Sequence, residues 1–125
     1  LAETIKKVFL KKYKKIIMVL GIMSDKDIQG IMKPLLPLAS DIVLTAPFYS
    51  RASSPEHLSI VAESVGLMNV RTAPTVKDAV EMAVSLTAHS DGNSSLVVVT
   101  GSFYTIGEAK EALGQKGILT RLREC

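Results

Sequence analysis

The chain has 125 residues, of which 47% are hydrophobic and 5% aromatic, so we expect one compact domain with its own core and exclude a disordered chain. The net charge of +3 comes from the first fifteen residues, which hold six lysines against one acid, Glu3. Because the single cysteine is Cys125 and no apolar run approaches the length of a membrane span, we expect neither disulfides nor a membrane segment, and a cytoplasmic location.

The amino-terminal segment predicts an amphipathic helix. Its apolar residues form one stripe at helical spacing: Leu1, Ile5, Val8 and Phe9. Its basic residues are Lys6, Lys7, Lys11, Lys12, Lys14 and Lys15. The segment lacks the aromatic interleaving of single-strand binders and a recognition-helix pattern, so we interpret the lysines as a solvated helix face and expect no nucleic-acid partner. Because the chain starts with Leu and not Met, we expect part of the protein to lie upstream.

From residue 16 onward, apolar runs typical of buried strands alternate with apolar residues at helical spacing. The predicted strands cover residues 16–23, 41–47, 68–73 and 96–99. The first strand is followed by a predicted helix with its cap at Ser24 or Asp25. That helix is expected to kink or stop near Lys33, because Pro34 cannot donate a backbone hydrogen bond.

Three more helices are predicted from the residues at which they begin. Ser54 and Pro55 begin a helix that is closed by Gly66. A capping box formed by Thr75 and Asp78 begins the next helix. Its inward-facing residues are expected to be Val76, Ala79, Val80, Ala83 and Leu86. The last helix begins with a capping box formed by Thr105 and Glu108.

Repeated strand and helix units of this length require parallel strands with right-handed crossovers. They predict an α/β fold, a three-layer α/β/α Rossmann-like domain with a mainly parallel sheet. Residues 48–54 are predicted to be a surface loop and residues 91–93 a turn. Residues 115–125 are predicted to be a loosely held tail with a short strand near Ile118.

Ligands of such sheets bind beyond the carboxyl ends of the strands. Polar residues follow two of the predicted strands there, at positions 24–27 and 100–105. After Gly101, the turn leads into a helix whose free N–H groups and positive dipole end would attract an anion. The alternative is that Gly101 only permits a tight bend, as in any α/β domain.

Three segments together resemble the carboxyl-terminal domain of folylpolyglutamate synthase and of its bifunctional dihydrofolate synthase relatives in the Mur ligase superfamily. The segments read GIMSDKDIQGIMKPLLPLA, TAPFYSRASSPEHL and VVVTGSFYTIGEAKEAL, and TGSFYT is the most specific part. The resemblance covers roughly residues 16–113. It implies a ligase that joins L-glutamate in amide linkage to a folate carboxylate, with ATP first forming an acyl phosphate. It also implies that the last strand lies beside the strand ending at Ser24.

Two motifs of that family are absent from this sequence. Nothing matches the phosphate-binding GxxxxGK[ST] loop, and the strand reading Asp-Gly-Ala-His-Asn-Pro, which would precede the helix at Leu1, is missing. The resemblance therefore implies that residues 1–125 are a carboxyl-terminal glutamate-ligase domain lacking its first strands. ATP and Mg would be bound by the upstream ATPase domain of the parent. This chain would supply part of the substrate-side wall, with L-glutamate and folate as ligands, and would be inactive alone.

The resemblance and the predicted strand ends select eight candidate binding residues, seven on the glutamate or phosphate side and Arg51. The seven are Asp25, Lys26, Asp27, Thr100, Ser102, Tyr104 and Thr105. Lys26 could pair with a carboxylate while the two aspartates position it or cap the helix; alternatively all three are solvated. The hydroxyl residues could bind a carboxylate or phosphate, or serve the turn and cap, and capping is favoured for Thr105.

Arg51, in the predicted loop, is a possible anion contact; alternatively it is solvated. His57 and His89 have no Cys, Asp or Glu at ligand spacing, so no metal ligand and no catalytic residue is assigned.

Three functions from different classes remain open at this point. The leading one is part of an ATP-dependent amide ligase, and the alternatives are a free-standing α/β regulatory or small-anion-binding module and a structural or oligomerisation domain. The missing strand would leave residues 96–100 as an open sheet edge. Such an edge recruits other chains, so we expect self-association.

Overall fold

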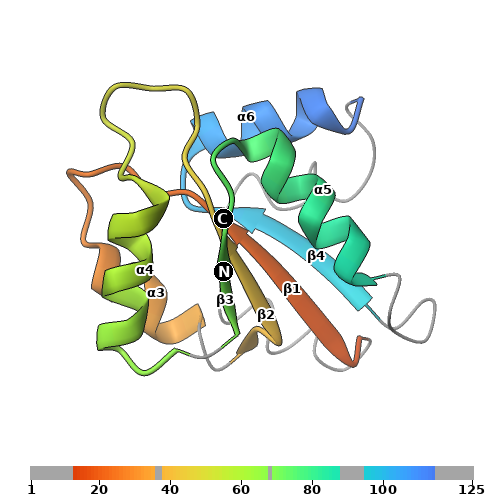
Figure 1. The fold of residues 1–125 in the computed structure, drawn as a ribbon, viewed down its shortest axis with the longest axis horizontal. Coiled ribbons are helices and arrows are strands. Elements are labelled where there is room, and N and C mark those ends of the chain that lie inside the picture. Colours follow the sequence, from red (N-terminus) through yellow and green to blue (C-terminus); the bar gives the residue numbers. More distant parts are fainter. Residues whose placement is uncertain (1–12, 36–37, 68, 88–94, 115–125) are drawn as a thin grey trace.

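A four-stranded sheet lies at the centre of the fold, with two helices on each face (Figure 1). The structure is a computed structural model that describes residues 13–35, 38–67, 69–87 and 95–114. The strands are β1 (Lys15–Leu20), β2 (Asp41–Leu44), β3 (Val70–Thr72) and β4 (Ser95–Thr100). The helices are α3 (Ile28–Leu35), α4 (Pro55–Ser64), α5 (Val76–Thr87) and α6 (Phe103–Ala112). This arrangement confirms the predicted three-layer α/β/α fold.

The sheet is parallel, and its strand order is β3-β2-β1-β4. The inner strand β1 pairs with both neighbours, so that Ile17 lies opposite Asp41 on one side and Val97 on the other. The last strand therefore lies beside the first, as the resemblance implied. From β1 the chain adds strands first on one side, as β2 and β3, and then on the other side, as β4. The point at which the direction changes lies between β1 and β4, and ligands of such sheets bind beyond the carboxyl ends of these two strands.

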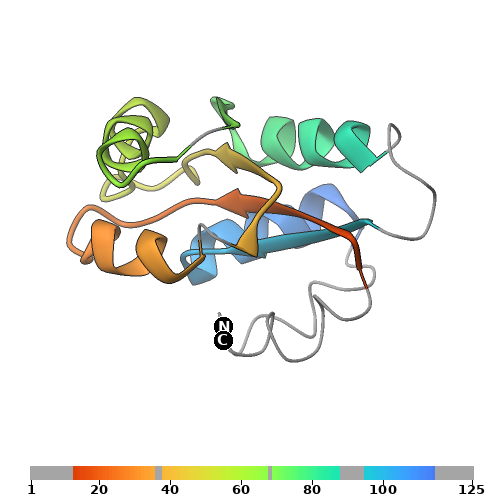
Figure 2. The ribbon, with the colours of Figure 1, turned by 90° about the horizontal axis from the view of Figure 1, so that it is seen from below.

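The continuous apolar run in β1 is explained by burial on both faces. Residues 16–20 are each at most 1% exposed. Alternate residues face opposite layers, so Met18 packs with α3 and α4, whereas Val19 packs with α5 and α6. In Figure 2 the strands run between these helices as a continuous twisted layer.

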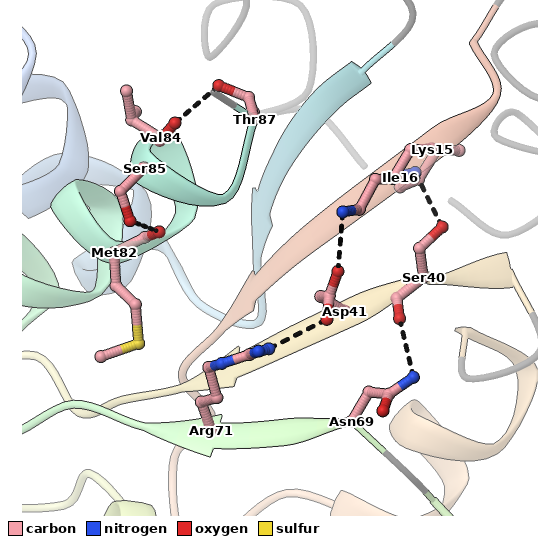
Figure 3. Close-up of polar contacts among 10 residues, drawn as sticks. All are labelled: Lys15, Ile16, Ser40, Asp41, Asn69, Arg71, Met82, Val84, Ser85 and Thr87. Carbon is pink, nitrogen blue, oxygen red and sulfur yellow. Dashed lines mark hydrogen bonds and ion pairs between the residues drawn. The ribbon is translucent and has the colours of Figure 1, made fainter. Parts of the chain in front are cut away.

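A cluster of charged side chains joins the strands near their amino-terminal ends (Figure 3). The Asp41 carboxylate, 13% exposed, lies 3.4 Å from the Lys15 ammonium and 2.9 Å from Arg71 Nη1. Nearby, the Ile16 N–H donates to the Ser40 hydroxyl at 3.3 Å. These contacts join β1, β2 and β3 in one register. The prediction that Lys15 belongs to a solvated helix face is wrong, because Lys15 begins β1 and pairs with Asp41.

Several predicted helix boundaries are confirmed. The Ser54 hydroxyl accepts a hydrogen bond from the His57 N–H at 3.1 Å and caps α4, with Pro55 as the first helical residue. Past the end of α4, Gly66 has a φ of +88°, as a closing glycine requires. The Thr75 hydroxyl accepts from the Asp78 N–H at 3.1 Å and begins α5.

The start and the end of α3 test two further predictions. The first choice of cap, Ser24 or Asp25, is wrong; the cap is Asp27, the alternative also named, because its carboxylate accepts the Gly30 N–H at 3.1 Å. The helix includes Pro34 and ends at Leu35, two residues after the predicted stop near Lys33. Pro34 sits in the last turn, so its ring removes only one intrahelical hydrogen bond.

The strands also differ from prediction at their ends. β1 ends at Leu20 and β2 at Leu44, each about three residues early, because the chain there leaves the ladder to form loops. The predicted amino-terminal helix up to residue 12, the turn at residues 91–93 and the tail at residues 115–125 lie outside the described residues. No helix in the described ranges is long and apolar enough to cross a membrane.

The outer edge of β4 generates a first prediction. Among the described strands, β4 pairs with β1 alone, and residues 96–100 carry neither charge nor proline to discourage pairing. We expect the 125-residue chain to self-associate through this edge, which sedimentation over a concentration series would detect. A monomer at every concentration would contradict this, and slow amide exchange at Val97 to Val99 in such a monomer would show that another segment covers the edge.

Candidate functional site

Two loops and the turn that begins α6 meet beyond the carboxyl ends of β1, β2 and β4. We call them together the carboxyl-edge site: residues 21–27, 45–54 and 101–105. The first two run antiparallel, since the Ser24 N–H donates to the Arg51 carbonyl at 2.7 Å and the Ser53 N–H donates to the Ile22 carbonyl at 3.0 Å. The backbone therefore places Arg51 beside the polar turn that follows β1.

Two glycines allow the first and third segments to touch. Gly101 has a φ of +114°, and a Cβ there would collide with the Gly21 carbonyl oxygen. A Cβ on Gly21 would lie 2.6 Å from the Thr105 hydroxyl oxygen and 3.2 Å from the Thr45 carbonyl oxygen. Side chains at either position would separate β1 from the start of α6.

The helix α6 begins with a cap at Ser102, so the predicted cap at Thr105 is wrong. The Ser102 hydroxyl accepts the Thr105 N–H at 3.0 Å. Thr105 is fully buried, and its hydroxyl donates to the Gly21 carbonyl at 3.0 Å. Because a threonine hydroxyl has one hydrogen, Ser102 must be the donor in the 2.7 Å contact between the two hydroxyls. Both side chains are thus engaged within the fold.

An aromatic stack links the loop after β2 to α6. The rings of Tyr49 and Tyr104 lie 4.1 Å apart between centroids at an interplanar angle of 15°. Arg51 Nη2 donates to the Tyr49 hydroxyl at 2.9 Å, and the guanidinium carbon lies 5.5 Å from the Tyr49 ring centroid. Sequence reasoning missed Tyr49. The signal was its place two residues before Arg51, in the segment TAPFYSRA.

These contacts change the acidity of both tyrosines. Hydrogen bonding with Tyr104, and then with Arg51, lowers the pKa of Tyr49 because both contacts stabilise the phenolate. The same hydrogen bond with Tyr49 raises the pKa of Tyr104. Arg51 has its pKa raised, first by the hydrogen bond to Tyr49, with a smaller contribution from the nearby Asp25 carboxylate.

The structure places the predicted residues in two groups. Ser102, Thr105 and Asp27 hold the fold, the last as the cap of α3, and Thr100 ends β4 with its carbonyl accepting the Gly21 N–H at 3.3 Å. Asp25, Lys26, Arg51 and Tyr104 are exposed around the carboxyl-edge site. No other described residue forms an ion pair or side-chain hydrogen bond with Lys26.

Two phenylalanines at the same edge project into solvent. Phe48 is 99% exposed and Phe103 is 80% exposed. The backbone of Phe48 is nevertheless fixed, because its N–H donates to the Glu108 carboxylate of α6 at 2.7 Å. Beneath this surface, the buried hydroxyls of Thr45 and Ser53 have no hydrogen-bond partner among the described residues.

The described residues do not form a metal or phosphate-loop site. Within the described ranges, no three His, Cys, Asp or Glu side chains lie close enough together to hold a metal ion. His57 is exposed in the first turn of α4, and His89 lies outside the described residues. The exposed cations and the start of α6 suit a carboxylate or phosphate.

Comparison with known proteins shows what this domain is similar to. The family model for the Mur ligase glutamate ligase domain matches residues 1–103. A dihydrofolate synthase/folylpolyglutamate synthase of Mycobacterium tuberculosis is 33% identical over 107 residues, covering 78% of this chain and 22% of that protein.

Solved structures agree with the sequence matches. Folylpolyglutamate synthase of Mycobacterium tuberculosis, complexed with ADP and AMPPCP, has a TM-score of 0.81 and 31% identity, covering 94% of this chain and 27% of that one. A bifunctional folylpolyglutamate synthase/dihydrofolate synthase with Mn, AMPPNP and L-glutamate bound has a TM-score of 0.68 and 25% identity, covering 90% of this chain and 26% of that one. The resemblance inferred from the three segments is confirmed, and the chain spans about a quarter of these relatives' length.

The buried hydroxyl of Thr105 generates a second prediction. Thr105→Val leaves the Gly21 carbonyl without its donor, so we expect the free energy of unfolding to fall by about 1–3 kcal/mol in urea titrations followed by circular dichroism. Thr105→Ser keeps the hydroxyl and is the matched control, with an expected loss of about 1 kcal/mol or less for the methyl group. Equal stability of Thr105→Val and the unaltered chain would contradict a stabilising role for this hydrogen bond.

Proposed function

The chain belongs to the Mur ligase family as a glutamate ligase domain, and from this premise we propose that it is the carboxyl-terminal domain of a folylpolyglutamate synthase. The longer ligase would join L-glutamate to a folate carboxylate, using ATP, in the cytoplasm. The observation that carries this proposal is the meeting of the TGSFYT turn, the turn holding Lys26 and the loop holding Arg51 at one edge of the sheet.

The carboxyl-edge site has the chemistry expected for an anionic substrate. Lys26 offers a compact charge, and Arg51 offers a planar guanidinium suited to a carboxylate. The N–H groups of Phe103 and Tyr104 precede the first intrahelical hydrogen bond of α6 and lie at the positive end of its dipole. Of the nearby acids, Asp27 caps α3, while Asp25 acts on Arg51 electrostatically.

The length of the relatives indicates which part of the ligase binds which ligand. The chain spans about a quarter of them, and it contains no GxxxxGK[ST] loop. We therefore assign ATP and Mg to the remaining part of the ligase. The domain of residues 1–125 would supply the wall that binds and orients glutamate, or the phosphate side of the reacting acyl group, and would contribute no catalytic residue or metal ligand.

A third prediction tests this division. The purified 125-residue chain is expected to show no ATP hydrolysis and no glutamate ligation, because the sequence has no phosphate-binding loop. The full-length protein containing it should incorporate labelled glutamate into a folate acceptor in the presence of ATP and Mg. Turnover by the chain alone would contradict the domain assignment, and an inactive full-length protein that binds small anions would favour the free-standing anion-binding alternative.

A fourth prediction concerns Lys26. In the full-length ligase, Lys26→Ala should raise the KM for glutamate by roughly tenfold to a hundredfold, since a charge-assisted contact contributes about 1.5–3 kcal/mol, and should change the KM for ATP much less. Lys33→Ala, which removes an exposed lysine from the last turn of α3, is the matched control. Equal effects of Lys26→Ala on both substrates would point to a structural role instead.

A further inference from the structure

The loop that carries Arg51 is fixed by contacts that go beyond what a surface turn needs. The Tyr49 N–H donates to the Pro47 carbonyl at 2.8 Å, and the Ala52 N–H donates to the Tyr49 carbonyl at 3.1 Å, so the chain turns tightly around Tyr49. The Arg51 carbonyl accepts the Ser24 N–H at 2.7 Å. The backbone on both sides of Arg51 is therefore held in place before any ligand arrives.

The side chain of Tyr49 packs against the first turn of α6. Its ring stacks on Tyr104 at a centroid distance of 4.1 Å, and Tyr104 belongs to the first turn of α6. That turn is itself joined through the Thr105 hydroxyl to Gly21, the residue that directly follows β1. The Tyr49 ring, although it belongs to a loop, is thus linked through the stack to the carboxyl end of β1.

The Arg51 guanidinium rests on this fixed ring. One donor, Nη2, is used by the Tyr49 hydroxyl at 2.9 Å, and the cation lies 5.5 Å from the ring centroid. A guanidinium has five N–H donors, and no other described side chain accepts from the remaining four. Asp25 acts on Arg51 electrostatically without forming an ion pair among the described residues. The Arg51 guanidinium is therefore held in one orientation and presents its remaining N–H donors to solvent.

From these contacts we propose that Tyr49 is a positioning residue, which holds Arg51 so that its free N–H groups receive a carboxylate of the substrate. The inference rests on the proposed function and names the group that the carboxyl-edge site takes. An arginine side chain loses much rotamer freedom when it binds a ligand. Because Tyr49 removes that freedom in advance, the ligand does not have to supply the ordering free energy. The planar fork matches a carboxylate in two parallel hydrogen bonds.

The competing explanation is that the two tyrosines merely fasten the loop to α6. Tyr49→Phe keeps the ring for stacking and removes the hydroxyl, which accepts from Arg51 and also hydrogen-bonds with Tyr104. Tyr104→Phe removes the hydroxyl–hydroxyl contact while leaving Arg51 its acceptor, and is therefore the matched control. Tyr49→Leu removes the ring as well. A fastening role predicts that Tyr49→Leu lowers the melting temperature, that Tyr49→Phe lowers it no more than Tyr104→Phe does, and that Tyr49→Phe leaves every KM unchanged.

In the full-length ligase, we expect Tyr49→Phe to raise the KM for one carboxylate substrate by about threefold to tenfold, with the KM for ATP and the melting temperature unchanged. Arg51→Lys should raise the same KM. The double variant should resemble Arg51→Lys alone, since Tyr49 acts through Arg51. Whether the KM for glutamate or for the folate changes identifies the carboxylate that Arg51 receives.

A spectroscopic arm uses the 125-residue chain and no ligand. The absorbance of tyrosinate in a pH titration should show Tyr49 ionising below the usual tyrosine pKa, and Arg51→Gln should move the pKa of Tyr49 upward because one donor to the phenolate is lost. Tyr49→Phe and Tyr104→Phe assign the signals. An unchanged titration in Arg51→Gln would overturn the proposed contact.

The possible outcomes separate this inference from the proposed function. If Arg51→Lys raises the KM for a carboxylate substrate and Tyr49→Phe does not, Arg51 is an anion contact and the positioning role of Tyr49 is wrong. If neither variant changes any KM while the ligase is active, the inference fails and the assignment to the ligase stands. If the full-length protein has no ligase activity, the proposed function fails first.

Discussion

The rest of the carboxyl-edge site depends on the close approach of β1 and α6. Gly21 and Gly101 meet without side chains between them, and the buried Thr105 hydroxyl closes the contact by donating to the Gly21 carbonyl. Because Gly21 follows the inner strand β1 and α6 follows its neighbour β4, this contact joins the two sides of the switch point. It also fixes the first turn of α6, to which the tyrosine stack is attached.

The polar residues at this edge divide into those that the fold uses and those that it leaves available. Asp27 and Ser102 cap helices, and the buried Thr105 hydroxyl satisfies the Gly21 carbonyl, which would cost about 1–3 kcal/mol if left unpaired. Lys26 and Arg51 keep charged donors exposed. A site that receives an anion needs both, because the first group holds the second in position.

The two ends of the strands differ in whether their charged side chains are paired within the domain. At the amino-terminal ends of the strands, the Asp41 carboxylate is paired with both Lys15 and Arg71, and these ion pairs join β1, β2 and β3. At the carboxyl edge, Arg51 uses one donor on Tyr49, and the exposed Phe48 and Phe103 lie on segments of fixed backbone. The end with unpaired charged groups is the carboxyl end, which is where parallel sheets bind ligands. This agrees with the proposed place of the domain in a larger ligase.

The sequence by itself determined the α/β class, the strands and the caps at Ser54 and Thr75, because apolar periodicity and capping preferences act over a few neighbouring residues. It also carried the family, through the segments around Asp25, Arg51 and Ser102. Only the tertiary structure decided that Asp27 and Ser102 are the caps, since neighbouring Ser, Thr and Asp residues have similar intrinsic preferences. Only the tertiary structure stacked Tyr49 on Tyr104, because a loop has no periodicity and this partner lies more than fifty positions away in the sequence, although Arg51 is only two residues from Tyr49.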